Sequence, residues 1–546
     1  MLNDKVDFQD TESRVESYTS HSDKDNEQKK QSFWTSIWFS NQDHHDIQKK
    51  YADVTLDLIQ QNGGDVGELT PEKEKKLRRK LWLTILPIVF IINATLFIDK
   101  DAISYSKLLG VYTDMNITAN DYNNVLTYFY VGYILGQIPS HYLIQRLPIS
   151  WYITGTLAIW SVLAFSTLAS RSYGGLAATR FFLGFFESGI TPCIEHTLGM
   201  FFTPAEQAIV NPIFWISCVG IDVPTGFISY GLQFVTKWRP WKWYWLFVGI
   251  VSTCSTVFAY FFYPDNPSSS WLFTTEEKIH IIRKVKNATR SSIELKSFKY
   301  YQFIECLKDP ISWLFFFYCF CNMLENSTMY QAATIYTELG FDHLKTTLLM
   351  VVQNGFGTFS AICGTIALSI FRKQSCFVAA AWLMPSLLGA ILAVSLPWSN
   401  KPGILGGMFL TRTNGTAYII VLSLSQATAA GYTKKLTRTL LFMIAYSISN
   451  IIAPQLWRSQ YKPRYRLSWI IQIVFSWFIS PIILLVIRYI LSRRNKERLA
   501  AMNDDNEEDY GFVETVDEDG NAKRTKVDIS MLDLTDLENK KFIYPL

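Results

Sequence analysis

Long apolar runs separated by short polar intervals fill the middle of this 546-residue chain. A helix crosses a bilayer core of roughly 30 Å with about 20 predominantly apolar residues. Runs of that length predict spans at 81–110, 124–144, 151–170, 176–201, 209–234 and 241–262, followed by 311–332, 345–371, 376–396, 403–424, 437–457 and 467–491. The pattern therefore predicts an all-α membrane protein with 12 transmembrane helices.

A polar interval splits these spans into two groups of six. The predicted parts are a disordered cytoplasmic N-terminal tail at 1–80, a first six-helix half at 81–262, a cytoplasmic central loop at 263–310, a second six-helix half at 311–491 and an acidic cytoplasmic C-terminal tail at 492–546. Both tails are polar and lack a periodic apolar pattern, so we expect them to be disordered. Two six-helix halves joined by a long loop resemble the major facilitator superfamily, in which the substrate site lies between the halves near mid-membrane.

Basic residues gather on one side of the predicted membrane. Six Lys or Arg residues precede the first span at 71–80, and further clusters occupy the central loop and follow the last span. The positive-inside rule therefore places these regions, and both termini, in the cytoplasm. The loop at 111–123 carries Asp114 and Asp121 but no Lys or Arg, as expected for an outside loop. In this loop the sequon that begins at Asn116 is a candidate glycosylation site.

The composition narrows the class of protein. Charged residues make up 18% of the chain, against about a quarter in soluble proteins. No basic domain with interleaved aromatic residues lies outside the spans, which argues against a nucleic-acid partner. Among the eight cysteines, Cys319 and Cys321 lack the second pair of ligands that a metal site needs. We predict no metal, no cofactor and no enzyme, because the spans contain neither paired histidines nor a cysteine cluster.

Ionisable residues inside the predicted spans are the strongest functional signal, because charge at bilayer depth is costly and usually functional. The first span contains Asp99 and Lys100. The fourth span contains Arg180 and Glu187, seven residues apart and hence on one helix face. Phenylalanines occupy the other faces of this span, so the polar stripe predicts a helix that lines a cavity.

Three further charges lie in predicted spans. Asp222 is in the fifth span, Glu325 in the seventh and Arg412 in the tenth, and each is a secondary candidate for the site. For all of these intramembrane charges a structural alternative exists, in which an ion pair only holds two helices together. The sequence leaves that alternative open.

The first-span pair Asp99-Lys100, together with Arg180 and Glu187, resembles the anion:cation symporter branch of the major facilitator superfamily, and within it the fungal allantoate permease family. The segments similar to cysteine carriers of that family are 52–56, 431–438, 533–539 and 542–546. The resemblance extends over about residues 50–546. It implies that Asp99 and Glu187 couple transport to protons, and that Lys100 and Arg180 bind the anionic group of the substrate.

The resemblance also implies a function, namely proton-coupled import of a small organic anion or zwitterion, with cysteine or a related organosulfur compound as the expected substrate. A permease for allantoate, nicotinate or a sulfonate is an alternative, and so is a nutrient receptor that moves no solute. Glu195, Asp222 and Glu325 depart from the family pattern, and extra acidic groups would disfavour a doubly charged anion. The expected partners are a small-molecule substrate, protons and the lipid bilayer, with a plasma-membrane location and a functional monomer.

Overall fold

The computed structural model describes residues 70–289, 299–371, 374–504, 510–516, 522–528, 534–539 and 542–546. Almost all of the predicted N-terminal tail therefore lies outside the described residues, as do parts of the central loop and of the C-terminal tail. Residues 57–546 form one compact unit, and all contacts given below lie within it.

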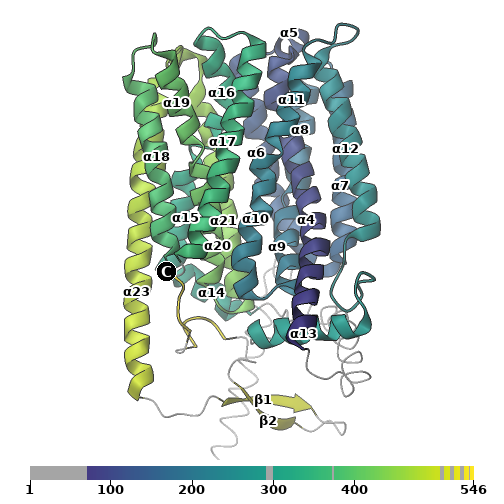
Figure 1. The fold of residues 1–546 in the computed structure, drawn as a ribbon, viewed down its shortest axis with the longest axis vertical. Coiled ribbons are helices and arrows are strands. Elements are labelled where there is room, and N and C mark those ends of the chain that lie inside the picture. Colours follow the sequence, from purple (N-terminus) through teal and green to yellow (C-terminus); the bar gives the residue numbers. More distant parts are fainter. Residues whose placement is uncertain are drawn as a thin grey trace, which may run out of the picture. The chain divides into compact units, whose positions relative to one another are not determined.

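The first half contains six spans, whose helices are labelled in Figure 1. Its first span is α4 (Pro71–Leu108), a continuous helix that carries Asp99 and Lys100 among buried apolar turns. The other spans are α6 (Ala119–Arg146), α7 (Ile149–Ala169), α8 (Tyr173–Glu187) with α9 (Ile190–Phe201), α10 (Pro204–Gly220) with α11 (Asp222–Leu232), and α12 (Pro240–Phe262). A short helix, α5 (Val111–Met115), lies in the loop between α4 and α6.

The second half repeats this arrangement. Its spans are α15 (Pro310–Met323) with α16 (Ser327–Glu338), α17 (His343–Ile370), α18 (Ser375–Ser395), α19 (Lys401–Thr411) with α20 (Asn414–Ala427), α21 (Tyr432–Ile452) with the turn η1 (Ala453–Trp457), and α22 (Arg466–Gln472) with the π-helical η3 (Ile473–Ile479) and α23 (Ser480–Asp504). The smaller elements are α13 (Thr275–Thr289), α14 (Tyr300–Lys308) and the turn η2 (Ser459–Tyr461). The predicted layout of twelve spans in two halves is thus confirmed.

Eight helical stretches among the described residues are long and apolar enough to cross a membrane. The remaining spans are α6, which is more polar, and three spans built from two shorter pieces: α8–α9, α15–α16 and α19–α20. Charged residues stand at breaks between helical pieces: Glu187 ends α8, Asp222 begins α11, and Glu325 and Arg412 lie between the pieces of their spans. Transporters use such discontinuous helices where they bind substrates and ions.

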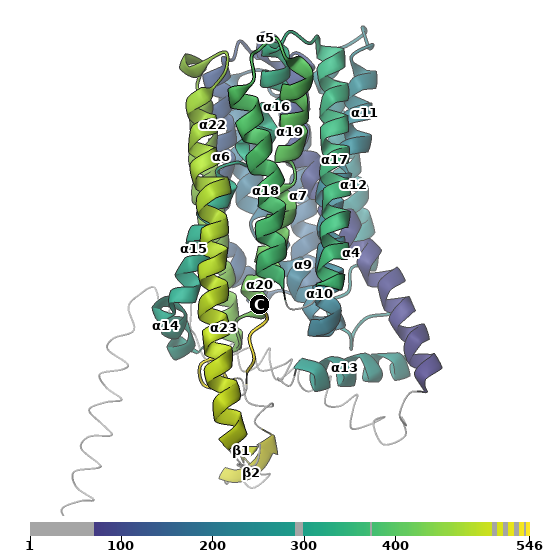
Figure 2. The ribbon, with the colours of Figure 1, turned by 60° about the vertical axis from the view of Figure 1, so that its left-hand side comes forward.

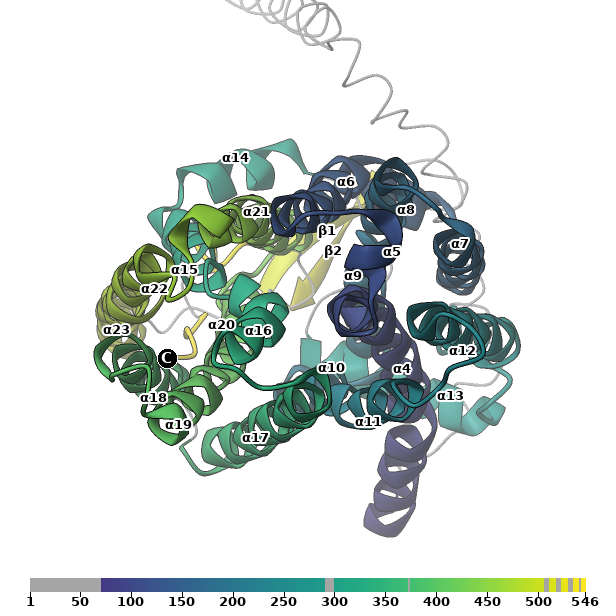
Figure 3. The same ribbon diagram turned by 90° about the horizontal axis from the view of Figure 1, so that it is seen from above.

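The two halves lie on opposite sides of the centre of the helix bundle (Figure 3). One buried apolar cluster includes side chains from both halves. We call the end of the bundle that carries α5 the α5 end. Side chains from the two halves bond directly there: Gln331 Nε2 donates to Asn123 Oδ1 at 2.7 Å, and Asn123 Nδ2 donates to the Trp457 carbonyl at 2.9 Å. Gln455 Nε2 likewise donates to the Thr127 hydroxyl at 2.9 Å. These bonds hold the halves together at the α5 end.

We call the opposite end of the bundle the α13 end, because α13 runs across it near the start of α4 (Figure 2). Two ion pairs attach α13 to the first half. Lys80 Nζ on α4 lies 2.6 Å from Glu277 Oε2, and Lys284 Nζ lies 2.6 Å from Glu206 Oε1 on α10. Part of the central loop is therefore fixed to the first half.

Part of the C-terminal tail that we expected to be disordered is structured. The strands β1 (Tyr510–Val516) and β2 (Ala522–Asp528) form an antiparallel hairpin. The last described residues, 534–539 and 542–546, pack on the second half, and we call them the terminal segment. Its residue Asp536 contacts Lys434 of α21, with 2.8 Å between Asp536 Oδ1 and Lys434 Nζ.

Candidate functional site

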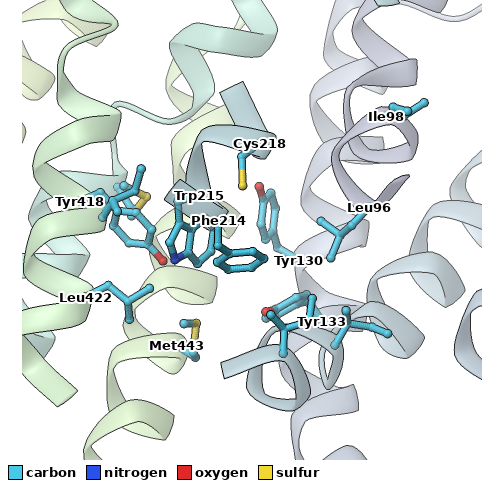
Figure 4. Close-up of a cluster of buried hydrophobic side chains, with 14 of the residues drawn as sticks. Leu96, Ile98, Tyr130, Tyr133, Phe214, Trp215, Cys218, Tyr418, Leu422 and Met443 are labelled. Carbon is cyan, nitrogen blue, oxygen red and sulfur yellow. The ribbon is translucent and has the colours of Figure 1, made fainter. Parts of the chain in front are cut away.

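A cavity of about 120 Å³ lies between the two halves. Several aromatic side chains line it, and three of them, Tyr133, Trp215 and Tyr418, belong to the buried hydrophobic cluster in Figure 4. Trp215 of α10 meets Tyr418 of α20 edge-on, with 6.4 Å between the ring centroids. Tyr133 of α6 and Met443 of α21 also line the cavity. Residues from both halves therefore share one enclosed space, which we call the central cavity.

Two of the predicted site residues, Lys100 and Glu187, meet in the central cavity. Lys100 Nζ donates to Glu187 Oε1 at 3.1 Å, and both side chains are almost fully buried. Lys100 Nζ also donates to the Tyr446 hydroxyl at 3.4 Å, which links α4 to the second half. The same ammonium lies 5.2–6.0 Å from the centroids of five aromatic rings, those of Phe97, Phe129, Tyr130, Tyr133 and Tyr446. Such rings stabilise a desolvated cation through their electron-rich faces.

The other two predicted site residues, Asp99 and Arg180, lie outside the lining of the central cavity. Arg180 Nη1 donates to the backbone carbonyl of Asp99 at 3.2 Å, and its guanidinium stacks 4.7 Å from the centroid of the Trp245 ring. Neither carboxylate oxygen of Asp99 has a hydrogen-bond partner among the described residues, nor do Nε and Nη2 of Arg180. Both side chains are buried, so the structure holds two charged groups near one another with unused hydrogen-bonding capacity.

Asp222 faces a second acid, Asp101 of α4, that the sequence analysis did not single out. Both side chains are buried, and no carboxylate oxygen of either residue has a hydrogen-bond partner among the described residues. Asp222 lines the central cavity as well as a small separate cavity of about 10 Å³ that it shares with Asp101.

Glu325 and Arg412 line the central cavity from the second half. Glu325 Oε2 accepts a hydrogen bond from Asn414 Nδ2 at 2.9 Å, and Arg412 Nη2 donates to Asn354 Oδ1 at 3.0 Å. No ion pair within 4.0 Å joins Glu325 to a cation in the described part of the chain. The three secondary candidates from the sequence thus all reach the central cavity.

The sequence analysis did not single out several residues that line the central cavity. Tyr133, Tyr446 and Asn414 were overlooked because tyrosine and asparagine also occur at lipid interfaces and in helix packing. The only local signal was the spacing of Tyr130 and Tyr133, three residues apart and so on one helix face.

The metal and glycosylation predictions concern positions outside the central cavity. No group of three or more His, Cys, Asp or Glu side chains that could hold a metal ion occurs in the described ranges. Asn116 is exposed in the loop between α5 and α6, at the α5 end. The hydroxyl of Thr118, the third residue of the sequon, takes part in the capping box that begins α6.

Comparisons with known proteins agree with this architecture. Residues 89–454 match the family model of the Major Facilitator Superfamily. The chain is 40% identical over 518 residues to the high affinity cysteine transporter of Saccharomyces cerevisiae, covering 93% of this chain and 98% of that protein. It is 46% identical over 507 residues to an uncharacterized transporter of Schizosaccharomyces pombe, covering 92% of this chain and 89% of that protein.

Solved structures show the same fold at low sequence identity. The proton:xylose symporter bound to 6-bromo-6-deoxy-D-glucose has a TM-score of 0.56 and 13% identity, covering 73% of this chain and 95% of that chain. A bacterial homologue of the lysosomal transporter Spinster, in an inward-facing and occupied conformation, has a TM-score of 0.54 and 14% identity, covering 74% of this chain and 96% of that chain. With two six-helix halves, a central cavity and these relatives, this chain is a multi-pass membrane transporter that belongs to the major facilitator superfamily.

Proposed function

We propose that this protein imports cysteine or a closely related organosulfur compound together with protons. The proposal rests mainly on one observation, the buried Lys100–Glu187 ion pair in the lining of the central cavity. The 40% identity to a protein named a high affinity cysteine transporter supports the choice of substrate. A cavity of about 120 Å³ also fits a small solute, since an engineered cavity of roughly 150 Å³ holds benzene.

Competition for Lys100 provides the coupling in this proposal. The carboxylate of an arriving substrate and the carboxylate of Glu187 would bind the same ammonium group, because Lys100 is the cation that Glu187 contacts. A buried carboxylate that loses its cation is costly, and taking up a proton neutralises it. Substrate binding at Lys100 would therefore favour proton binding at Glu187, and release of one would favour release of the other.

Asp99 and Arg180 also belong to the proposed site, although neither side chain lines the central cavity. Arg180 fixes the α4 backbone at Asp99, the residue directly before Lys100. In the described conformation Arg180 positions Lys100, and we propose that it reaches the anionic group of the substrate when α4 and α8 move during alternating access. Asp99, with both oxygens unpartnered, is a second group able to take a proton.

Uptake of labelled cysteine tests both parts of the proposal. We expect wild-type protein to accumulate cysteine against its gradient, more strongly as the outside pH falls, and to lose accumulation when a protonophore is added. Asp99→Asn and Glu187→Gln should abolish accumulation while cysteine binding persists. The matched control is Glu338→Gln, at the end of α16 and paired with Lys462 at the surface. Protonophore-sensitive accumulation by both neutral variants would rule out these residues as the coupling site.

Two measurements distinguish this proposal from a permease for another anion and from a receptor that moves no solute. Allantoate, nicotinate and sulfonates should compete weakly with cysteine if the substrate assignment is right. Binding of cysteine with no accumulation, in cells where a known importer accumulates it, would instead support a receptor that moves no solute.

We further propose a plasma-membrane location with both termini in the cytoplasm and the α5 end outside. The six basic residues at 71–80 and the exposed Asn116 at the α5 end support this orientation. Glycosidase treatment should shift the gel mobility of the wild type and leave that of Asn116→Gln unchanged. Cleavage of the C-terminal tail by protease added to intact cells would contradict the orientation.

A further inference from the structure

The charges that line the central cavity do not suit a substrate that carries only negative charge. Three acidic side chains, Glu187, Asp222 and Glu325, line the cavity, against two basic ones, Lys100 and Arg412. A simple anion would add to this acidic excess in a space where water screens little. A zwitterion brings its own cation, which needs an acidic partner.

Glu325 is placed to be that partner. Its side chain is held at one oxygen only, because Oε2 accepts the 2.9 Å hydrogen bond from Asn414 and Oε1 has no partner among the described residues. Asn414 is itself oriented by two donors, since its Oδ1 accepts from Asn322 Nδ2 at 2.8 Å and from Trp477 Nε1 at 3.2 Å. The network therefore fixes the Glu325 carboxylate while leaving one oxygen available.

The neighbouring residue, Asn326, supplies another acceptor. Asn326 Nδ2 donates to Asn450 Oδ1 at 2.6 Å and to the Tyr130 hydroxyl at 3.3 Å, so its side-chain oxygen is not used by these bonds. Both Glu325 and Asn326 line the cavity. An ammonium group has three donors and no acceptor, so a carboxylate oxygen beside an amide oxygen is a suitable place for it.

The two cations that line the cavity with Glu325 do not contact it, although the charge of Arg412, whose guanidinium bonds the neutral amide of Asn354, acts on Glu325 at a distance. Lys100 pairs with Glu187, and Arg412 is held by Asn354 on α17, with no nitrogen of either within 4.0 Å of a Glu325 oxygen. Glu325 is only 6% exposed, so its charge is buried without a contacting cation. A buried carboxylate without a contacting cation is costly, and a ligand that supplies a cation stabilises it.

We propose that Glu325 binds the ammonium group of the substrate while Lys100 binds its acidic group, which makes the substrate class small zwitterions such as amino acids rather than simple carboxylates or sulfonates. This inference rests on the proposed transport function and extends it. A bound zwitterion would bridge α4 of the first half and the α15–α16 break of the second. The substrate itself would then couple the movement of the two halves.

The test compares zwitterions with analogues that lack the ammonium group, using the purified full-length protein. The pairs are cysteine with 3-mercaptopropionate and taurine with ethanesulfonate, and binding is measured as the concentration that gives half of the maximal thermal shift. We expect at least one zwitterion to bind 10-fold or more tightly than its partner. Equal or tighter binding of the partners, or no binding by either zwitterion, would overturn the proposal.

A variant locates the preference at Glu325. Glu325→Gln keeps an oxygen for the Asn414 hydrogen bond but removes the charge, so it should reduce the preference for the zwitterion to less than 3-fold. Glu338→Gln, on the adjoining helix and outside the cavity, should keep the wild-type preference. An unchanged preference in Glu325→Gln would exclude Glu325 as the ammonium partner. If taurine binds in this way and cysteine does not, the cysteine assignment fails while the ammonium site stands.

Discussion

Adjacent charges on α4 have different partners, and the sequence alone could not assign them. Successive residues on a helix point about 100° apart, so Asp99 and Lys100 could be predicted to face different neighbours. Which neighbour each one meets depends on how α4 is rotated against α8. In the structure Lys100 contacts Glu187 inside the cavity, while the Arg180 side chain contacts the backbone of Asp99 behind it. Which of the four predicted residues contact one another could therefore be read only from the fold.

Replacing Lys100 separates substrate binding from stability. In Lys100→Ala, Glu187 loses its buried cation, so we expect a loss of roughly 3–5 kcal/mol of stability along with binding. The double variant Lys100→Gln/Glu187→Gln should recover the melting temperature but not cysteine binding, because neither residue then offers a charge. Arg180→Ala should weaken binding less than Lys100→Ala does, because Arg180 lies outside the cavity lining. Cysteine binding by the double variant at wild-type affinity would show that Lys100 has only a structural role.

Close packing between α6 and α8 places Glu187. A Cβ atom added at Gly184 would lie 1.9 Å from the Phe129 carbonyl oxygen, and one added at Gly132 would lie 2.0 Å from the Phe181 carbonyl oxygen. The two helix backbones are thus in direct contact, as small residues permit in membranes. Because such contacts look like ordinary apolar sequence, the analysis of spans did not reveal which glycines were indispensable.

Substituting Gly184 tests this contact. We expect Gly184→Ala to force α8 away from α6, which costs about 1–3 kcal/mol or more and displaces Glu187 from Lys100. The control is Gly174→Ala in the same helix, where an added Cβ meets nothing within 4 Å. The measurements are the yield of monodisperse protein, its melting temperature and cysteine uptake. Normal behaviour of Gly184→Ala would mean that the helices can separate without affecting the site.

The terminal segment is an element that the hydrophobic pattern could not predict, because it is held by polar contacts to several helices, and two of its partners, Lys434 and Glu305, are more than a hundred residues away. Lys434 is fully buried between Asp536 and Glu305, at 2.8 Å from an oxygen of each. Tyr544 donates its hydroxyl to the other oxygen of Asp536 at 2.8 Å. The segments 431–438 and 533–539, which resemble cysteine carriers, thus meet in space at Lys434 and Asp536.

Removing the charge of Asp536 should loosen the terminal segment. Asp536→Asn weakens a charge-assisted contact with Lys434, and we expect a loss of about 2 kcal/mol, seen as a lower melting temperature and faster proteolysis of the C-terminus. The control in the same segment is Leu537→Ala, whose side chain is exposed. Equal effects of the two substitutions would show that the ion pair contributes nothing specific.

Asp309, which lies 3.6 Å from Lys434, affects how the stability of this region depends on pH. Burial alone would raise the pKa of Asp309, but the surrounding cations Arg438, Lys434 and Arg494 lower it below the ordinary value of 3.8. Because the folded-state pKa is depressed, its contribution to stability is complete above the ordinary value and is lost as the pH falls through the folded value. Proteolysis of the terminal segment should therefore be constant from about pH 5 to 8. A marked increase in cleavage between pH 7 and pH 5 would contradict this.

At the scale of the whole molecule, the number and grouping of spans could be predicted from the sequence. The end of the bundle at which the two halves are in contact could not. Span length and charge bias depend on local composition, which the sequence contains directly. Which end of the bundle is closed depends on contacts between halves that are far apart in the chain. In the structure these are hydrogen bonds at the α5 end, among them Gln331 to Asn123 and Gln233 Nε2 to the Thr347 hydroxyl at 2.6 Å.

Weakening the α5 end should open the central cavity to the outside. Asn123 bonds both Gln331 and the Trp457 carbonyl, so Asn123→Ala removes two links between the halves at once. Cys218 lines the cavity and can report this opening in protein that keeps it as the only cysteine. We expect a membrane-impermeant thiol reagent, added to intact cells, to label Cys218 several-fold faster in Asn123→Ala than in the parent.

The control is Thr113→Ala, which is exposed at the same end and whose hydroxyl donates to the nearby Gly110 carbonyl; it should be labelled at the same rate as the parent. Equally slow labelling in Asn123→Ala would mean that these hydrogen bonds do not control access, and that the apolar packing of α11 on α17 and of α6 on α21 keeps the α5 end closed.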